Sequence, residues 1–174
     1  MNSTRQNVVL IGMSGAGKST LGVLLAKTLG LHFTDTDILI QQKTGKLLQQ
    51  IIDGDGIDRF LQIEEEVVST LELQNCVIAT GGSVVYSEKA MEHLKKDALT
   101  VYLYADYEEI RGRLSNIKTR GIVFKGKNDL RAVYDERLPL YERYADLRID
   151  CTLGDIETSV ERIADAVKES YGTR

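Results

Sequence analysis

Short apolar runs alternate with longer stretches of helical periodicity along the whole chain. The runs predict strands, because they are brief, rich in β-branched and aromatic residues, and followed by glycine or charged residues. These predicted strands are residues 8–11, 31–34, 77–79, 100–104 and 147–151. Strands separated by helices favour an α/β fold, with a mostly parallel sheet covered by helices on both faces.

Two helical segments show clear amphipathic patterns. The buried stripe of segment 57–73 is Phe60, Ile63, Val67 and Leu71, and that of the closing helix is Val160, Ile163, Ala164 and Val167. Glu64, Glu65 and Glu66 lie beside the first stripe. Adjacent helical residues point about 100° apart and cannot converge on one metal ion, so we interpret them as a solvated face. Pro139 predicts a kink or a restart in the helix that contains it.

The segment directly after the first predicted strand reads GMSGAGKS over residues 12–19. This is the G-x-x-x-x-G-K-S pattern of a phosphate-binding loop, and a helical pattern follows it as that motif requires. Glycines let successive backbone N–H groups wrap a phosphate chain, and the helix N-terminus adds positive charge. Lys18 would reach the outer phosphates and Ser19 would ligate Mg²⁺.

Two further short motifs follow predicted strands. Asp35 and Asp37 come after the second strand, where ligands of open α/β sheets bind. They suit Mg²⁺ waters and a substrate hydroxyl, and Asp37 also suits a helix N-cap, an interpretation compatible with the first. Gly81 and Gly82 come after the third strand and permit either close approach of a ligand or a plain tight turn.

Residues 115–129 form a basic, glycine-containing segment after the helix predicted at 106–114. Such loops are often lids over active sites, and the alternative is a disordered basic loop. The apolar group at 122–124 argues against pure disorder. We therefore expect a lid at about 115–129 and an acceptor-binding region at about 35–73, within a single domain of residues 1–174.

Composition narrows the function classes. The 174 residues carry a net charge of −4 without a lysine or arginine block, which argues against nucleic acid or a membrane as partner. No apolar run is long enough to span a membrane and no signal peptide is evident, so we expect a cytoplasmic protein. We also expect a monomer. Cys76 and Cys151 lie in apolar runs and are expected to be core residues.

Taken together, these motifs resemble the shikimate kinase family, small P-loop kinases related to nucleoside monophosphate kinases. The resemblance spans residues 8–167 and rests on six features. They are the phosphate loop, Asp35-Thr36-Asp37, Phe60 with Glu64-Glu65-Glu66-Val67-Val68, Gly81-Gly82, Arg120, and Arg137-Leu138-Pro139-Leu140-Tyr141. It implies a five-stranded parallel sheet, a mobile lid, and transfer of a phosphoryl group from ATP to a hydroxyl of a cyclic hydroxy acid.

The resemblance also implies roles for single residues. The catalytic residues would be Lys18, Asp37 and Arg120. Ser19 and Asp35 would bind Mg²⁺. The acceptor would contact Asp37, Gly81, Gly82 and Arg137, and Arg137 would bind its carboxylate. The nucleotide would meet Gly12, Ser14, Gly15, Ala16, Gly17, Lys18, Ser19, Thr20, Arg113 and Arg120, with Arg113 over the adenine.

Three positions depart from the family pattern. Ser83 replaces a third glycine, Gly121 replaces the proline after the lid arginine, and Leu61 replaces an arginine that grips the acceptor carboxylate. The resemblance makes shikimate, giving shikimate 3-phosphate, the first expected acceptor. Because Leu61 replaces the arginine, another hydroxylated acid or amino acid is the alternative. A nucleotide-binding protein without turnover is a further alternative, against which the retained Arg120 argues. Arg59 lies about 200° from position 61 on a helix, so it would substitute only if the helix began later or shifted its register.

Overall fold

The computed structural model describes residues 7–115, 129–152 and 154–172. Its centre is a five-stranded sheet of order β2-β3-β1-β4-β5 in which every neighbouring pair is parallel. The strands are β1 (Asn7–Ile11), β2 (His32–Asp35), β3 (Cys76–Ala79), β4 (Ala98–Tyr104) and β5 (Leu147–Asp150). The α/β fold predicted from the apolar runs is confirmed.

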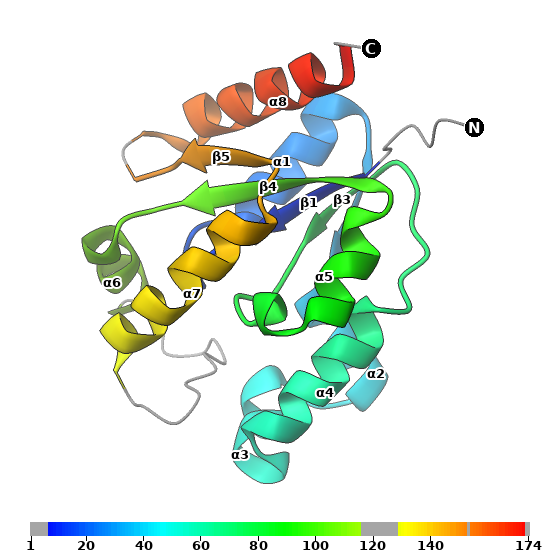
Figure 1. Ribbon diagram of the computed structural model, residues 1–174, viewed down its shortest axis with the longest axis vertical. Coiled ribbons are helices and arrows are strands. Elements are labelled where there is room, and N and C mark those ends of the chain that lie inside the picture. Colours follow the sequence, from blue (N-terminus) through cyan, green and yellow to red (C-terminus); the bar gives the residue numbers. More distant parts are fainter. Residues whose placement is uncertain (1–6, 116–128, 153, 173–174) are drawn as a thin grey trace.

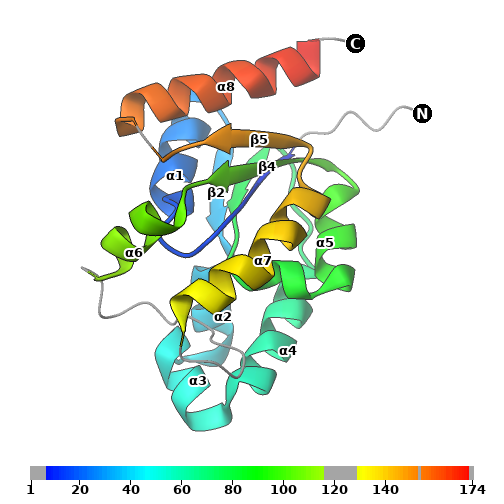
Figure 2. The ribbon, with the colours of Figure 1, turned by 60° about the vertical axis from the view of Figure 1, so that its left-hand side comes forward.

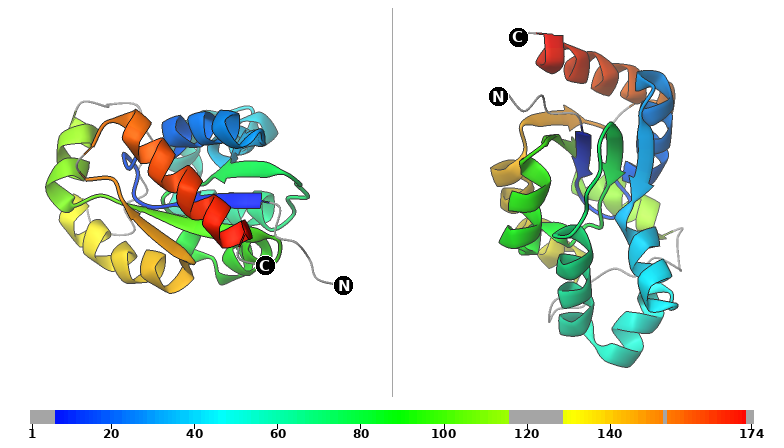
Figure 3. Two further views of the ribbon diagram at one scale, coloured as in Figure 1. Left: turned by 90° about the horizontal axis from the view of Figure 1, so that it is seen from above. Right: turned by 90° about the vertical axis from the view of Figure 1, so that its right-hand side faces the viewer.

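Helices cover both faces of this sheet (Figure 3). One face carries α1 (Lys18–Leu29) and α8 (Ile156–Gly172), and the other carries α5 (Glu88–Lys95) and α7 (Leu130–Tyr144). The remaining helices are α2 (Thr36–Thr44), α3 (Leu48–Asp55), α4 (Ile57–Val68), the 3-10 helix η1 (Val84–Tyr86) and α6 (Tyr107–Ser115). Helices α2, α3 and α4 project beyond the sheet (Figure 1).

The buried apolar residues form two separate clusters. The larger one contains the sheet together with the inner sides of α1, α5, α7 and α8, and it includes Cys76 and Cys151 as free thiols. The smaller cluster lies among α2, α3 and α4 and consists of Ile40, Ile51, Phe60, Ile63 and Val67. The crossover from β2 to β3 thus has a small core of its own.

Two details of the helices differ from the sequence prediction. Helix α4 ends at Val68, so Leu71 packs against the main core from outside the helix. Helix α7 continues through Pro139, so a restart there is wrong. Proline leaves the carbonyl group four residues earlier without its helical partner. That residue is Asp135, which lies on the exposed side of α7.

The carboxyl ends of the parallel strands lie at one edge of the sheet, because all strands run in the same direction (Figure 2). The loop after β1, the end of β2 and the loop after β3 therefore meet there. Helix α7 passes the same edge (Figure 2). Among the residues described, no helix combines the length and the apolar character needed to cross a membrane.

Candidate active site

The loop between β1 and α1 has a backbone that requires glycine. Gly12 has a φ of +146°, and a Cβ placed there would lie 2.7 Å from the carbonyl oxygen of Leu103. Gly17 has a φ of +93° and forms the N-cap of α1, whose first residue is Lys18. The N–H groups of the first helical turn, which have no partner within the helix, therefore border the loop, which is the arrangement that binds phosphate.

Lys18 is folded over this loop. Its side chain is buried, with 7% of the residue exposed, and its Nζ donates hydrogen bonds to the carbonyl oxygens of Gly12 at 2.6 Å and Met13 at 2.7 Å. The ammonium group is thus held beside the loop's backbone amides. This is where a phosphate chain would need a positive charge.

Ser19, Asp35 and Asp37 form a connected group at the ends of β2 and the loop. The Ser19 hydroxyl donates to Asp35 Oδ2 at 2.6 Å, and Asp35 Oδ1 accepts from the backbone N–H of Asp37 at 2.9 Å. Asp35 is therefore the N-cap of α2, and the prediction that Asp37 caps it is wrong, because the helix begins at Thr36, two residues before the start at Ile38 that an Asp37 cap requires. A hydroxyl and a carboxylate are the oxygen ligands that Mg²⁺ prefers, so this pair fits the metal.

Gly81 packs directly against two carboxyl groups. A Cβ at Gly81 would lie 2.9 Å from Asp37 Oδ1 and 2.5 Å from Glu64 Oε1. Any larger residue would displace one of these side chains. The structure therefore brings Asp37 and Gly81 together as predicted, and it adds Glu64.

Gly82 lies between the phosphate loop and Arg137. A Cβ at Gly82 would lie 3.0 Å from both Arg137 Nη1 and the Ser14 hydroxyl. Tyr141 donates to the Gly82 carbonyl at 2.6 Å, and Arg137 Nε donates to the Tyr86 hydroxyl at 3.2 Å. The Arg137 residue is 0% exposed, so an arginine from α7 reaches the edge of the phosphate loop through the protein interior.

Glu64 is the site residue that the sequence prediction missed. It is 2% exposed and accepts a hydrogen bond from the Ser83 hydroxyl at 2.7 Å, so its assignment to a solvated face is wrong. Burial raises the pKa of its carboxyl group to about 7, with a further increase from Asp37, against the opposing effects of Ser83, Arg137 and Lys18. The available signal was its spacing, because a residue four positions after Phe60 lies on the same helix face.

A cavity of about 420 Å³ is bordered by the phosphate loop. It is lined by Gly15, Ala16, Gly17, Thr20, Leu21, Arg113, Cys151, Gly154, Asp155, Ile156 and Ser159. Arg113 donates to the carbonyl oxygens of Gly15 and Cys151, both at 3.2 Å, and to Glu109 at 2.7 Å. Its guanidinium plane is thus fixed at the cavity wall, beside the residues expected to bind a nucleotide.

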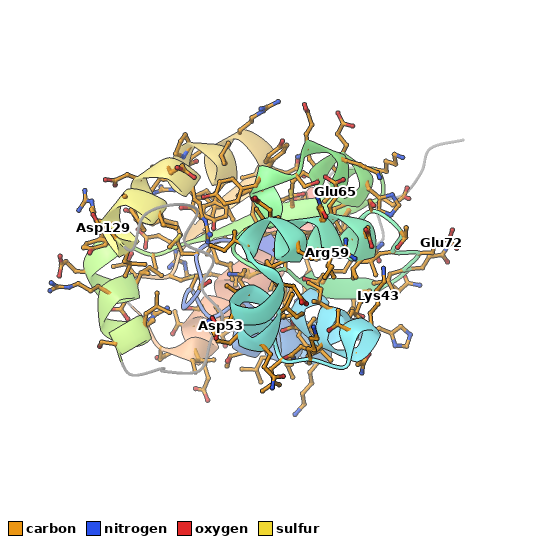
Figure 4. The ribbon with its side chains drawn as sticks, turned by 90° about the horizontal axis from the view of Figure 1, so that it is seen from below. Lys43, Asp53, Arg59, Glu65, Glu72 and Asp129 are labelled. Carbon is orange, nitrogen blue, oxygen red and sulfur yellow. The ribbon has the colours of Figure 1, made fainter. Side chains whose placement is uncertain are left out.

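The predicted lid and its Arg120 lie outside the described residues, and only the lid's two ends are described. Ser115 is the last residue of α6. Asp129 is the N-cap of α7 and accepts from the backbone N–H of Arg131 at 3.0 Å (Figure 4).

Neither Leu61 nor Arg59 supplies a cation to the acceptor side. Leu61 packs against the smaller apolar cluster. Helix α4 begins at Ile57, as predicted, and Arg59 lies on its outer side near Lys43 (Figure 4). Arg59 is half exposed and pairs with Glu66 at 3.6 Å, so it does not replace the missing arginine.

Comparison with known proteins identifies this arrangement. The family description "Shikimate kinase" matches residues 14–168. The chain belongs to the shikimate kinase family. A shikimate kinase from Thiobacillus denitrificans is 35% identical over 173 residues, which cover 98% of this chain and 91% of that protein. One from Thermodesulfovibrio yellowstonii is 37% identical over 169 residues, covering 95% of each.

Solved structures agree with this family. Shikimate kinase from Acinetobacter baumannii, in complex with shikimate, has a TM-score of 0.87 and 32% identity, covering 97% of this chain and 96% of that chain. A sugar kinase from Janibacter shares 18% identity with a TM-score of 0.58, which shows the fold alone. The family inferred from the motifs is confirmed, and ATP is the phosphate donor of that family.

Proposed function

We propose that this protein transfers the γ-phosphoryl group of ATP to a hydroxyl group of shikimate, giving shikimate 3-phosphate. The observation that carries the proposal is the convergence of Asp37, Gly81, Gly82 and Arg137 beside the phosphate loop. A carboxylate and a guanidinium there match the hydroxyl and carboxylate groups of a cyclic hydroxy acid. The high-coverage match to the shikimate-bound relative supports the same acceptor.

Each polar group has a part in this proposal. The loop amides and Lys18 would hold the phosphates and Arg113 would lie over the adenine. Ser19 and Asp35 would hold Mg²⁺, which would neutralise phosphate charge. Asp37, which packs against Gly81, would accept the proton of the attacking hydroxyl.

Arg137 would hold the acceptor carboxylate in this arrangement. We assign Arg120 to closure of the lid over both substrates. The cytoplasmic location and monomeric state expected from the sequence remain predictions.

A second candidate acceptor is another hydroxylated acid or a hydroxyl-bearing amino acid. The observation that favours it is Leu61, which occupies the position of a carboxylate-binding arginine and packs in an apolar cluster instead. Loss of one partner of a buried charge pair costs about 2–5 kcal/mol, or roughly 30- to 4000-fold in affinity. Arg137 retains part of the carboxylate affinity.

The two candidates are separated by measuring ADP formation at saturating ATP and Mg²⁺ with a panel of hydroxylated acids and amino acids. The proposal expects ADP and shikimate 3-phosphate in equal amounts when shikimate is present. ADP formation that shikimate does not increase, together with turnover of another acceptor, would establish the second candidate. A panel without any turnover would refute both.

A further inference from the structure

The side chain of Tyr86 contacts the guanidinium group of Arg137 in two ways. Its hydroxyl accepts a hydrogen bond from Arg137 Nε at 3.2 Å, and the central guanidinium carbon lies 5.1 Å from the centre of its ring. A cation within about 6 Å over an aromatic ring is attracted by the electron density of the ring. One tyrosine therefore holds the guanidinium by a directional hydrogen bond and by a ring contact.

A second residue of α7 orients the Tyr86 hydroxyl. The hydroxyl donates its proton to Glu136 Oε1 at 2.5 Å. A phenol has a single O–H group, so with the proton directed at Glu136 the lone pairs of the oxygen accept from Arg137 Nε. Burial and the hydrogen bond to Glu136 raise the pKa of Tyr86, against the opposing effect of Arg137, so the hydroxyl stays protonated at neutral pH.

The place of Tyr86 in the fold links this contact to the acceptor side of the site. Tyr86 is the last residue of η1, which follows the loop that contains Gly82. A Cβ at Gly82 would lie 3.0 Å from Arg137 Nη1, so this nitrogen borders the loop. The guanidinium group is planar and rigid. Fixing Nε from the end of η1 therefore also fixes the direction in which Nη1 points.

An arginine held in this way binds a carboxylate at a lower entropic cost. A long side chain loses rotamer freedom when it is immobilised by a ligand, and a side chain that is already immobilised does not lose it again. The saving matters most where one guanidinium acts without a second one. Leu61 stands where the family pattern has the second arginine and packs against the smaller apolar cluster.

We propose that Tyr86 is a positioning residue that holds Arg137 ready for the acceptor carboxylate and so offsets part of the affinity lost with an arginine at position 61. Tyr86 acts through Arg137 and does not itself bind the acceptor. This inference rests on the proposed function, in which Arg137 holds the carboxylate. It assigns the affinity of a single guanidinium to the tyrosine beside it.

The two contacts of Tyr86 can be removed separately, and the chain offers a matched control. Tyr86→Phe removes the hydroxyl and keeps the ring, whereas Tyr86→Leu removes both. The control is Tyr104→Phe. The Tyr104 ring also carries an arginine, Arg148, at 4.0 Å, and that arginine pairs with Glu142 at 3.0 Å. Melting temperature and ATP binding establish that each variant is folded.

The first measurement is steady-state kinetics with shikimate at saturating ATP and Mg²⁺. Tyr86→Phe should raise the KM for shikimate about 5- to 20-fold and leave kcat and the KM for ATP within about twofold. Tyr86→Leu should raise the KM for shikimate further, by about 30-fold or more in total. Tyr104→Phe should behave as wild type. An unchanged KM for shikimate in Tyr86→Phe, or an equal rise of both KM values, would overturn the assignment. If Tyr86→Leu does not fold, Tyr86→Phe decides alone.

The second measurement combines Tyr86→Phe with Leu61→Arg. A second guanidinium on α4 shares the carboxylate, so the accuracy with which Arg137 is held should matter less. The rise of the KM for shikimate caused by Tyr86→Phe should therefore shrink to about threefold or less in the Leu61→Arg protein. A general loss of packing at Tyr86 would raise the KM by the same factor in both proteins. Equal factors would overturn the link between Tyr86 and Leu61.

The third measurement needs no acceptor and separates this inference from the proposed function. The Nε–H group of Arg137 is buried and hydrogen-bonded, so its NMR signal, assigned by through-bond correlation to the Arg137 backbone, should exchange slowly with water. Exchange in Tyr86→Phe should be about tenfold faster or more, and in Tyr104→Phe unchanged. Equal exchange in wild type and Tyr86→Phe would refute the positioning of Arg137. A wild type that does not phosphorylate shikimate would refute the proposed function, and the exchange rates would still decide whether Tyr86 holds Arg137.

Discussion

Replacing Glu64 with glutamine should make the stability of the fold less dependent on pH. The pKa of the Glu64 carboxyl is raised from 4.5 to about 7 by burial, so the folded protein binds this proton more tightly than the unfolded chain does. The corresponding stabilisation is fully present below pH 4.5 and is lost as the pH rises to about 7. Each pKa unit corresponds to 1.36 kcal/mol, so the loss amounts to about 3 kcal/mol.

The measurement is urea unfolding of wild type, Glu64→Gln and Glu65→Gln between pH 4.5 and 8, without nucleotide or acceptor. The difference in unfolding free energy between Glu64→Gln and wild type should shift in favour of the variant by about 3 kcal/mol over this range. Glu65→Gln corrects for the loss of one carboxylate from α4. Parallel pH profiles for wild type and Glu64→Gln would show that Glu64 titrates normally and that the burial argument fails.

Further substitutions test the rest of the site. Lys18→Ala should lower kcat at least about 100-fold in a folded protein, because the developing phosphoryl charge loses its ammonium partner, and near-normal turnover would refute that role. Leu61→Arg should lower the KM for shikimate by about 30-fold or more, and an unchanged KM would show that this position is not decisive. Gly82→Ala places a Cβ 3.0 Å from Arg137 Nη1 and should raise the KM for shikimate more than the KM for ATP, which initial rates at varied concentrations measure. Chelation of Mg²⁺ should stop turnover, and recovery on adding Mg²⁺ controls for unfolding.

The sheet and the phosphate loop could be predicted because their signals are local. Strands β1, β3 and β4 are buried along their length, whereas the edge strands β2 and β5 are partly exposed, and each prediction falls within two residues of the observed boundary. The loop pattern 12–19 determines a specific backbone, because Gly12 leaves no room for a side chain against Leu103. Each of these features is determined by residues that lie close together in the sequence, so the sequence alone is enough to predict it.

The acceptor side could be predicted only in part, because its geometry depends on contacts between distant segments. Helix α4 is buried against the smaller apolar cluster and also against the loop after β3, so its buried surface is wider than one stripe. The pattern of apolar residues reveals the contact of α4 with the smaller cluster. It does not reveal the contact with the loop after β3, because that contact is a hydrogen bond from Ser83 to Glu64. The N-cap at Asp35 was missed for a similar reason, since Asp35 and Asp37 are equally good capping residues and only the backbone decides between them.

The two separate apolar clusters have a consequence for how this enzyme can diverge. The phosphate loop and α1 are anchored in the larger cluster, whereas Leu61 and the helices around it pack on the smaller one. Effects of substitutions at distant sites without shared partners add nearly independently. The preference for an acceptor can therefore drift through changes in α2, α3 and α4, while the phosphate loop and the sheet keep their stability and the chain keeps its use of ATP.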